Sequence, residues 1–113
     1  MTMQNPYSGE TMNVMFQTSK YTYNGRPYIG LMSFDEEFEF WEPWCDVTVN
    51  LADATPDEGC VFIDTNNAPY IAGWLQEQKI GTPTGRFAPS GWCLYPEFRI
   101  DFDLVEQNKL PEM

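Results

Sequence analysis

The chain has 113 residues and a formal net charge of −11, from 17 carboxylates against six Lys and Arg. With 42% apolar residues it can bury one hydrophobic core, and a second domain would lack the residues to fill another. The negative charge excludes a surface that follows nucleic-acid phosphates, so we predict no direct nucleic-acid binding; the charge favours a cationic partner or serves solubility.

The chain shows no membrane or export feature. No apolar run approaches the roughly 20 residues that cross a bilayer, and Met1 to Glu10 lacks the basic and apolar regions of a signal peptide. The three cysteines Cys45, Cys60 and Cys93 form no Cys-x-x-Cys pair, which is typical of reduced thiols. We therefore expect a cytoplasmic protein without disulfides or membrane contact.

No internal repeat or low-complexity tract divides the sequence, so we expect a single domain over residues 1–113. Residues 1–9 and 106–113 show no clear periodic pattern. We expect these two segments to be peripheral or flexible.

A β-hairpin is predicted near the N-terminus. Met12, Val14 and Phe16 alternate with polar residues, and the apolar stretch Tyr28 to Phe34 follows the dipeptide Asn24-Gly25. Asn-Gly between two such runs is typical of a tight turn that joins antiparallel strands.

Two further strands are predicted in the middle of the chain. Residues 44–51 place Cys45, Val47, Val49 and Leu51 on one face, as in a half-buried strand. After a turn at residues 56–59, Cys60 to Asp64 is a β-branched and aromatic run suited to a buried strand that pairs with its predecessor.

One helix of about three turns is predicted over residues 68–79. Asn67 can cap its N-terminus, and Pro69 falls in the first turn, where a missing N–H costs nothing. Apolar residues then recur at helical spacing until Gly81, which we expect to end the helix.

The C-terminal part is predicted to be a loop followed by an amphipathic strand. Thr82 to Gly91 is rich in Pro and Gly, and Trp92 to Tyr95 is apolar. From Phe98 to Leu104, apolar residues alternate with a polar set that would share one face, Glu97, Arg99, Asp101 and Asp103. Strand geometry would separate Asp101 and Asp103 by about 6–7 Å.

Together these elements predict an α+β fold. We expect one antiparallel sheet of about five to six strands, with the helix over residues 68–79 packed on one face and the other face partly exposed.

The amino-acid sequence gives little support for enzymatic activity. Histidine is absent, which removes the commonest general base and metal ligand. The carboxylates lie in hydrophilic runs rather than alone among apolar residues, which disfavours a carboxylate pair with one raised pKa. We therefore predict no catalytic residues, no enzymatic activity and no cofactor.

Zinc binding is an alternative for the three cysteines. If their strands are neighbours, Cys45, Cys60 and Cys93 can form a site together with Asp46 or Asp64. Free cysteine is also one of the most buried residue types, so the competing interpretation is that these thiols belong to the core.

The strongest candidate for a functional surface is the segment 35–44, where carboxylates and aromatic residues alternate. Carboxylates pair with Arg or Lys, while aromatic rings are typical interface anchors. The competing interpretation is a solvated hairpin edge whose aromatic residues fold inward. We predict that a basic protein surface contacts the following residues: Asp35, Glu36, Glu37, Glu39, Trp41, Glu42, Trp44, Asp101 and Asp103.

Several strings resemble a known family. They are Val47-Thr48-Val49-Asn50-Leu51, the run Cys60 to Asn67, Pro83-Thr84-Gly85 and Tyr95-Pro96. Over about residues 12–104 the chain resembles small, acidic, uncharacterised proteins carried on conjugative and other mobile elements of Firmicutes. The resemblance implies no catalytic residue. It implies an anti-defence role of the anti-CRISPR type.

Three functions follow as hypotheses. In the first, the chain inhibits a CRISPR effector or restriction nuclease by occupying its basic surface. In the second, it is an accessory or structural protein of conjugation that acts through protein–protein association. In the third, it is a zinc-binding structural protein. The sequence does not fix the oligomeric state.

Overall fold

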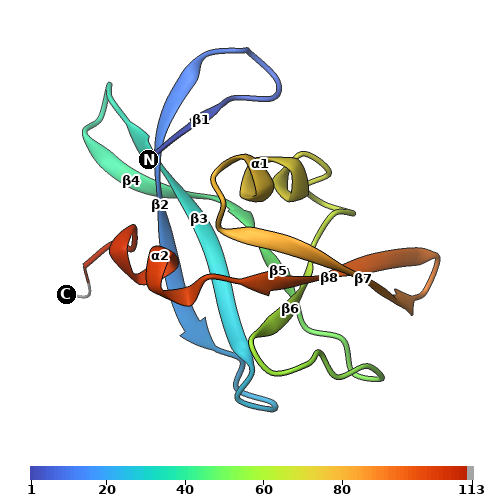
Figure 1. Cartoon of the computed structure of the whole chain (residues 1–113). Helices are drawn as coiled ribbons and strands as arrows, with labels where there is room; N and C mark the ends of the chain where they lie inside the picture. Colours follow the sequence, from blue (N-terminus) through green and yellow to red (C-terminus); the bar gives the residue numbers. More distant parts are fainter. Residues whose placement is uncertain (112–113) are drawn as a thin grey trace.

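Two antiparallel sheets make up most of the computed structural model, which describes residues 1–111 (Figure 1). The first sheet has the order β1-β2-β3-β4, with β1 Thr2–Gln4, β2 Thr11–Lys20, β3 Pro27–Asp35 and β4 Phe40–Asp46. The second has the order β5-β6-β8-β7, with β5 Thr48–Val49, β6 Cys60–Ile63, β7 Gly81–Ser90 and β8 Cys93–Ile100. Two short helices, α1 Ile71–Glu77 and α2 Phe102–Gln107, accompany them.

The α+β class is confirmed, but the single sheet of five to six strands is wrong. The predicted strand over residues 44–51 is divided at Val47, where the chain changes partners. The Val47 N–H donates to the carbonyl of Ile29 at 2.9 Å, and its carbonyl accepts the N–H of Asp64 at 2.9 Å. Val47 therefore links β3 of the first sheet to the end of β6, and alternation along the sequence cannot reveal such a change of partner.

The N-terminal hairpin is confirmed. Strands β2 and β3 pair in antiparallel register from Val14 opposite Ser33 to Lys20 opposite Pro27. Gly25 has a φ of 72°, a left-handed conformation that glycine adopts without strain. Its N–H donates to the carbonyl of Tyr21 at 2.8 Å, which closes the turn.

The terminal segments contribute to the fold more than we expected. Residues 2–4 form β1, and Met3 is only 3% exposed. Near the other end, the Phe16 N–H donates to the carbonyl of Asn108, and the Leu110 N–H donates to the carbonyl of Phe16, each at 2.8 Å. Neither segment is merely peripheral, although residues 112–113 lie outside the described chain.

Helix α1 is shorter than predicted. The helix begins at Ile71 with Tyr70 as its N-cap, so Asn67 is not the N-cap. The N–H and side-chain amide of Asn67 donate instead to the Asp64 carboxylate in the preceding turn. Gly81 does not end the helix either. Lys79 adopts a left-handed φ of 59°, and the Ile80 N–H donates to the carbonyl of Leu75 at 3.0 Å, so the helix has ended before Gly81 begins β7.

The C-terminal prediction needs two corrections. The supposed loop over residues 82–91 belongs mostly to β7, an edge strand, where Pro83 and Pro89 are tolerated. The supposed strand to Leu104 ends at Ile100, and α2 follows. Alternation of apolar and acidic residues continues from the strand into the helix, which is why the sequence pattern hid this boundary.

The main core lies between the two sheets and includes both helices. Its fully buried members come from both sheets and α1, among them Phe16, Ile29, Ile63 and Ile71. A smaller cluster of Leu51, Phe62, Ala88 and Tyr95 lies on the second sheet. None of the described helices is long and apolar enough to cross a membrane.

Candidate partner-binding surface

The acidic and aromatic segment forms the hairpin between β3 and β4, which extends away from the rest of the molecule at the upper left of Figure 1. The Asp35 carboxylate shapes its turn by accepting the N–H groups of Glu37 at 2.9 Å and Phe38 at 3.1 Å. Glu39 completes the turn with a left-handed φ of 55°. Local hydrogen bonds and a return into β4 thus define the hairpin.

The hairpin carries five carboxylates. Glu36, Glu37 and Glu39 are exposed in the turn, whereas Asp35 and Glu42 are partly buried in the flanking strands. Among the ion pairs formed within residues 1–111, none includes any of these carboxylates. The charge of this hairpin is therefore not compensated by cations of the described chain.

The aromatic residues of the hairpin are divided between its two faces. Phe34 lies opposite Trp41, and their rings pack edge to face with centroids 5.3 Å apart. Asp35 lies opposite Phe40. Because opposed residues share a face and neighbours alternate, Trp41 faces one side while Asp35 and Phe40 face the other.

Two phenylalanines provide the apolar surface closest to the carboxylates. Phe38 is 69% exposed and Phe40 46% exposed, and their ring centroids are 6.4 Å apart. The competing expectation, that all the aromatic residues fold inward, is therefore wrong for these two. Exposed rings beside unpaired carboxylates combine the two components of an interface that binds a cationic surface.

A shallow hollow of about 390 Å³ lies beside the Trp41 face of the hairpin. Its lining comes from the start of the chain and from three strands: Met1, Asn13, Val14, Met15, Phe34 and Trp41. Asn13, Met15 and Phe34 alternate with core residues along their strands, so the hollow lies on the face of the first sheet that is turned away from the core.

Trp44 lies apart from the exposed part of the hairpin. A register shift between Leu31 and Met32 makes it an extra residue in β4. Its ring packs against Tyr7 with centroids 6.3 Å apart, and its side chain contacts the main core. The structure therefore gives Trp44 a packing role rather than a place beside the turn carboxylates.

Asp101 and Asp103 do not form a row on a strand. Both are exposed at the start of α2, where the Asp101 side chain accepts the N–H of Leu104 at 3.1 Å and caps the helix. Asp103 lies in the first turn, where a negative charge favours the helix dipole. The positions of these two carboxylates are explained by their stabilising effect on α2. They also belong to a different element from the acidic hairpin.

The cysteines are not arranged as a metal site. They lie on three strands, and no three His, Cys, Asp or Glu side chains among residues 1–111 are placed to hold a metal ion. Burial raises the pKa of the Cys45 thiol to about 11, and burial also raises the pKa of Cys60. In both residues burial disfavours the thiolate, which is the form that zinc binds.

The possible carboxylate ligands have other roles. Asp46 accepts the hydroxyl hydrogen of Tyr28 at 2.7 Å, and Asp64 accepts two hydrogen bonds from Asn67. The geometry therefore gives the zinc alternative no support.

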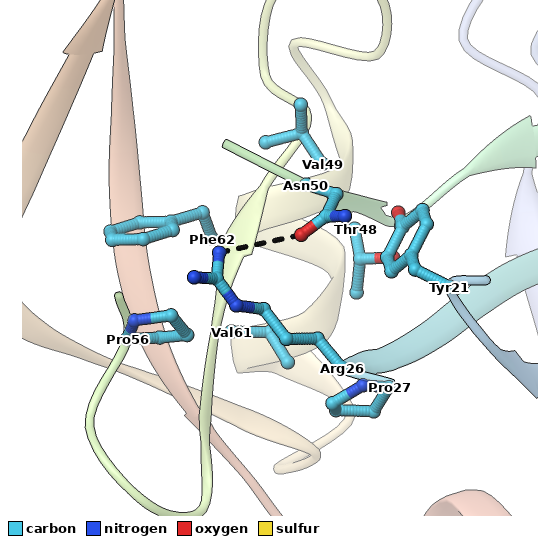
Figure 2. A pocket seen from close by; sticks show the side chains of 9 residues that line it. All are labelled: Tyr21, Arg26, Pro27, Thr48, Val49, Asn50, Pro56, Val61 and Phe62. Atoms are coloured by element: carbon cyan, nitrogen blue, oxygen red, sulfur yellow. Dashed lines mark hydrogen bonds between the residues drawn. The ribbon is translucent and has the colours of Figure 1, made fainter. Parts of the chain in front are cut away.

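Arg26, shown in Figure 2, is occupied by its own chain. Its Nη1 donates to the carbonyls of Leu51 at 2.8 Å and Ala54 at 2.9 Å and to Asn50 Oδ1 at 3.4 Å. The adjacent cavity is only about 10 Å³, roughly the room that one water needs. Arg26 thus holds the segment after β5 against the β2–β3 hairpin.

The sequence did not reveal one buried carboxylate, Glu97. It is 1% exposed on β8, where Oε2 accepts the Asp57 N–H at 3.0 Å and Oε1 accepts the Thr84 hydroxyl at 2.7 Å. Arg86 lies 3.7 Å from the same carboxylate and forms a shorter ion pair with Asp57 at 2.7 Å. Alternation placed Glu97 outside, but the irregular pairing of β7 between Pro83 and Phe87 covers it.

A comparison with protein families adds one finding. Residues 15–112 match the model of a family described as a domain of unknown function, DUF4313. The chain belongs to the DUF4313 family. The match covers β3, β4 and the whole second sheet, and it leaves out β1. No curated protein and no solved structure matches this DUF4313 chain.

Proposed function

We propose that this DUF4313 protein is a non-catalytic binding protein whose β3–β4 hairpin docks on a basic protein surface. The observation that carries the proposal is the composition of that hairpin. It presents three exposed carboxylates that have no ion-pair partner among the described residues, and beside them two exposed phenylalanines. Arg and Lys of a partner supply the missing counter-charges, and the rings supply anchors.

The target class that we propose is a nucleic-acid-binding defence nuclease, either a CRISPR effector or a restriction enzyme. Such enzymes hold nucleic acid in basic grooves, and a protein with a net charge of −11 is attracted to the same grooves. The resemblance to proteins of mobile elements supports this choice, since an incoming element benefits from blocking these nucleases.

The second candidate is an accessory role in conjugation through protein–protein association. It is favoured by a separate observation, the exposed apolar residues Phe87, Trp92 and Leu94 on the β7–β8 hairpin.

Two charge-matched variants test the proposal. One carries Glu36→Lys, Glu37→Lys and Glu39→Lys in the hairpin. The control carries Asp53→Lys, Glu58→Lys and Glu77→Lys, three exposed sites outside the hairpin. Each reversal adds two positive charges, so both variants have the same formal net charge.

Binding to purified CRISPR and restriction nucleases, and inhibition of their DNA cleavage, are then measured. We expect the hairpin variant to lose both, while the control keeps most of the native potency. Association should also slow as ionic strength rises, because exposed charges are screened beyond about 10 Å at 0.1 M salt. If both variants lost binding and inhibition equally, net charge alone would explain the loss, and docking through the hairpin would be contradicted.

A further inference from the structure

The hairpin between β7 and β8 carries three exposed large apolar side chains, one of which, Trp92, is the most exposed large apolar side chain of residues 1–111. Trp92 in its turn is 105% exposed, Leu94 63% and Phe87 61%. No charged residue occurs from Phe87 to Pro96, although the chain as a whole is 20% charged. Exposed apolar surface of this kind marks an interaction site more often than a random feature of the surface.

The strand register shows why these side chains remain uncovered. Phe87 pairs with Pro96, and Pro89 pairs with Leu94, so these four residues share one face of the hairpin. The alternate residues, including Ala88 and Tyr95, face the small cluster with Leu51 and Phe62. One face of the hairpin is therefore packed, and the opposite face is apolar without a partner among residues 1–111.

We propose that this apolar face is the contact between two copies of the chain. Two molecules that each carry a charge of −11 repel each other, and a neutral surface is where they can approach at the lowest electrostatic cost. The β7–β8 hairpin is on the right of Figure 1, far from the acidic β3–β4 hairpin at the upper left. A dimer joined through β7–β8 therefore keeps its two acidic hairpins apart.

The available area is suited to a weak dimer. Aromatic side chains bury about 150–250 Å² each, so burial of Phe87, Trp92 and the smaller Leu94 in both copies covers at most on the order of 1,000 Å². That area is at the lower limit of specific interfaces, in the range of transient association. We expect association at tens to hundreds of micromolar rather than a permanent dimer.

The contact is through the face of the hairpin and not through its edge. β7 is the edge strand of the second sheet, but Pro83 and Pro89 lack the N–H groups that a strand of another molecule would need. Two apolar faces packing together do not use those groups, so the prolines do not hinder the proposed contact.

Sedimentation velocity of the full chain in reducing buffer tests the proposal. From about 5 to 500 μM, the average mass should rise from the 13.1 kDa of the monomer towards twice that value. The double variant Trp92→Ala, Leu94→Ser should remain monomeric, or its dissociation constant should rise at least tenfold. Both side chains are exposed, so the variant should keep the circular dichroism spectrum of the native chain. Phe38→Ser, which changes an exposed ring on the acidic hairpin, is the matched control and should associate like the native protein.

The dependence of association on ionic strength distinguishes this contact from docking at the proposed nuclease site. Higher ionic strength screens repulsion between the two copies and should strengthen the dimer, whereas it should weaken docking of the acidic hairpin. A native chain that stays monomeric at 500 μM in 0.5 M salt would overturn the proposal. Equal association of the Trp92→Ala, Leu94→Ser variant would also overturn it. So would flotation of a monomeric native chain with phosphatidylcholine vesicles, because that result would assign the apolar face to a membrane.

Discussion

Replacing Glu97 with leucine should destabilise the protein much more than replacing it with glutamine. Leucine leaves the Asp57 N–H, at 3.0 Å from the carboxylate, and the Thr84 hydroxyl, at 2.7 Å, without their acceptor. Each hydrogen bond to a charged group contributes about 1.5–3 kcal/mol. The Thr84 hydroxyl can turn to the Glu97 carbonyl at 3.4 Å, so we expect Glu97→Leu to cost about 2–4 kcal/mol.

Glutamine can keep both contacts, with its amide oxygen accepting the Asp57 N–H and its amide nitrogen donating to Thr84 Oγ1. It loses the attraction of Arg86 at 3.7 Å, but the Arg86 side chain is 54% exposed, so that loss is small. We expect Glu97→Gln to cost about 1 kcal/mol, and Arg86→Gln to cost less than about 1 kcal/mol.

Urea unfolding of the three variants, followed by circular dichroism, measures these differences. For a domain of this size, about 3 kcal/mol corresponds to a fall of the melting temperature by on the order of 10 °C. If Glu97→Leu unfolds within about 0.5 kcal/mol of the native chain, the buried hydrogen bonds are not what stabilises the β7–β8 region. If glutamine costs as much as leucine, charge rather than acceptor geometry is decisive.

Three smaller changes probe other parts of the fold. Burial raises the pKa of Cys45 from 9.0 to about 11, so between these pH values the folded chain retains a proton that the unfolded chain loses. The contribution of the protonated thiol to the free energy of unfolding is therefore complete below pH 9 and is lost towards pH 11. Urea titrations at several pH values should show a shallower alkaline decline in Cys45→Ala. Asp101→Ala removes the cap of α2 and should cost about 0.5–2 kcal/mol in thermal unfolding, whereas Asp103→Ala should cost less. Glu39→Gly relieves a left-handed φ of 55° and should stabilise the chain by roughly 0.5–1 kcal/mol; an unchanged melting temperature would show that the turn is not strained.

Local patterns in the sequence predicted local structure well. The hairpin at Asn24-Gly25 and the buried strand at Cys60 were found because turn chemistry and apolar runs act over a few residues. The division into two sheets was not found, because it depends on Val47 bonding to residues distant in the chain, Ile29 and Asp64. The start of α2 was hidden because Asp101 fits both an alternating strand and a helix cap.

The same distinction applies to the candidate surface. Exposure of Glu36, Glu37 and Glu39 was predictable because a charged turn has little to pack against. The inward position of Trp44 was not predictable, because it follows from a register shift opposite Leu31. The burial of Glu97 depends on Thr84 and Asp57, which approach it from other segments. The acidic segment could thus be singled out from the sequence, but its hairpin conformation and the features that long-range packing decides could not.

The most direct test of docking through the acidic hairpin is a quantitative pull-down from a bacterial lysate that expresses CRISPR and restriction effectors. Three tagged baits are compared at moderate salt by mass spectrometry: the native chain, the hairpin variant Glu36→Lys, Glu37→Lys, Glu39→Lys, and its charge-matched control. If the hairpin is the docking site, a large basic nuclease is recovered with the native chain and the control and is lost with the hairpin variant. Recovery of the same proteins by all three baits, or of transfer-apparatus components without a nuclease, would contradict this prediction.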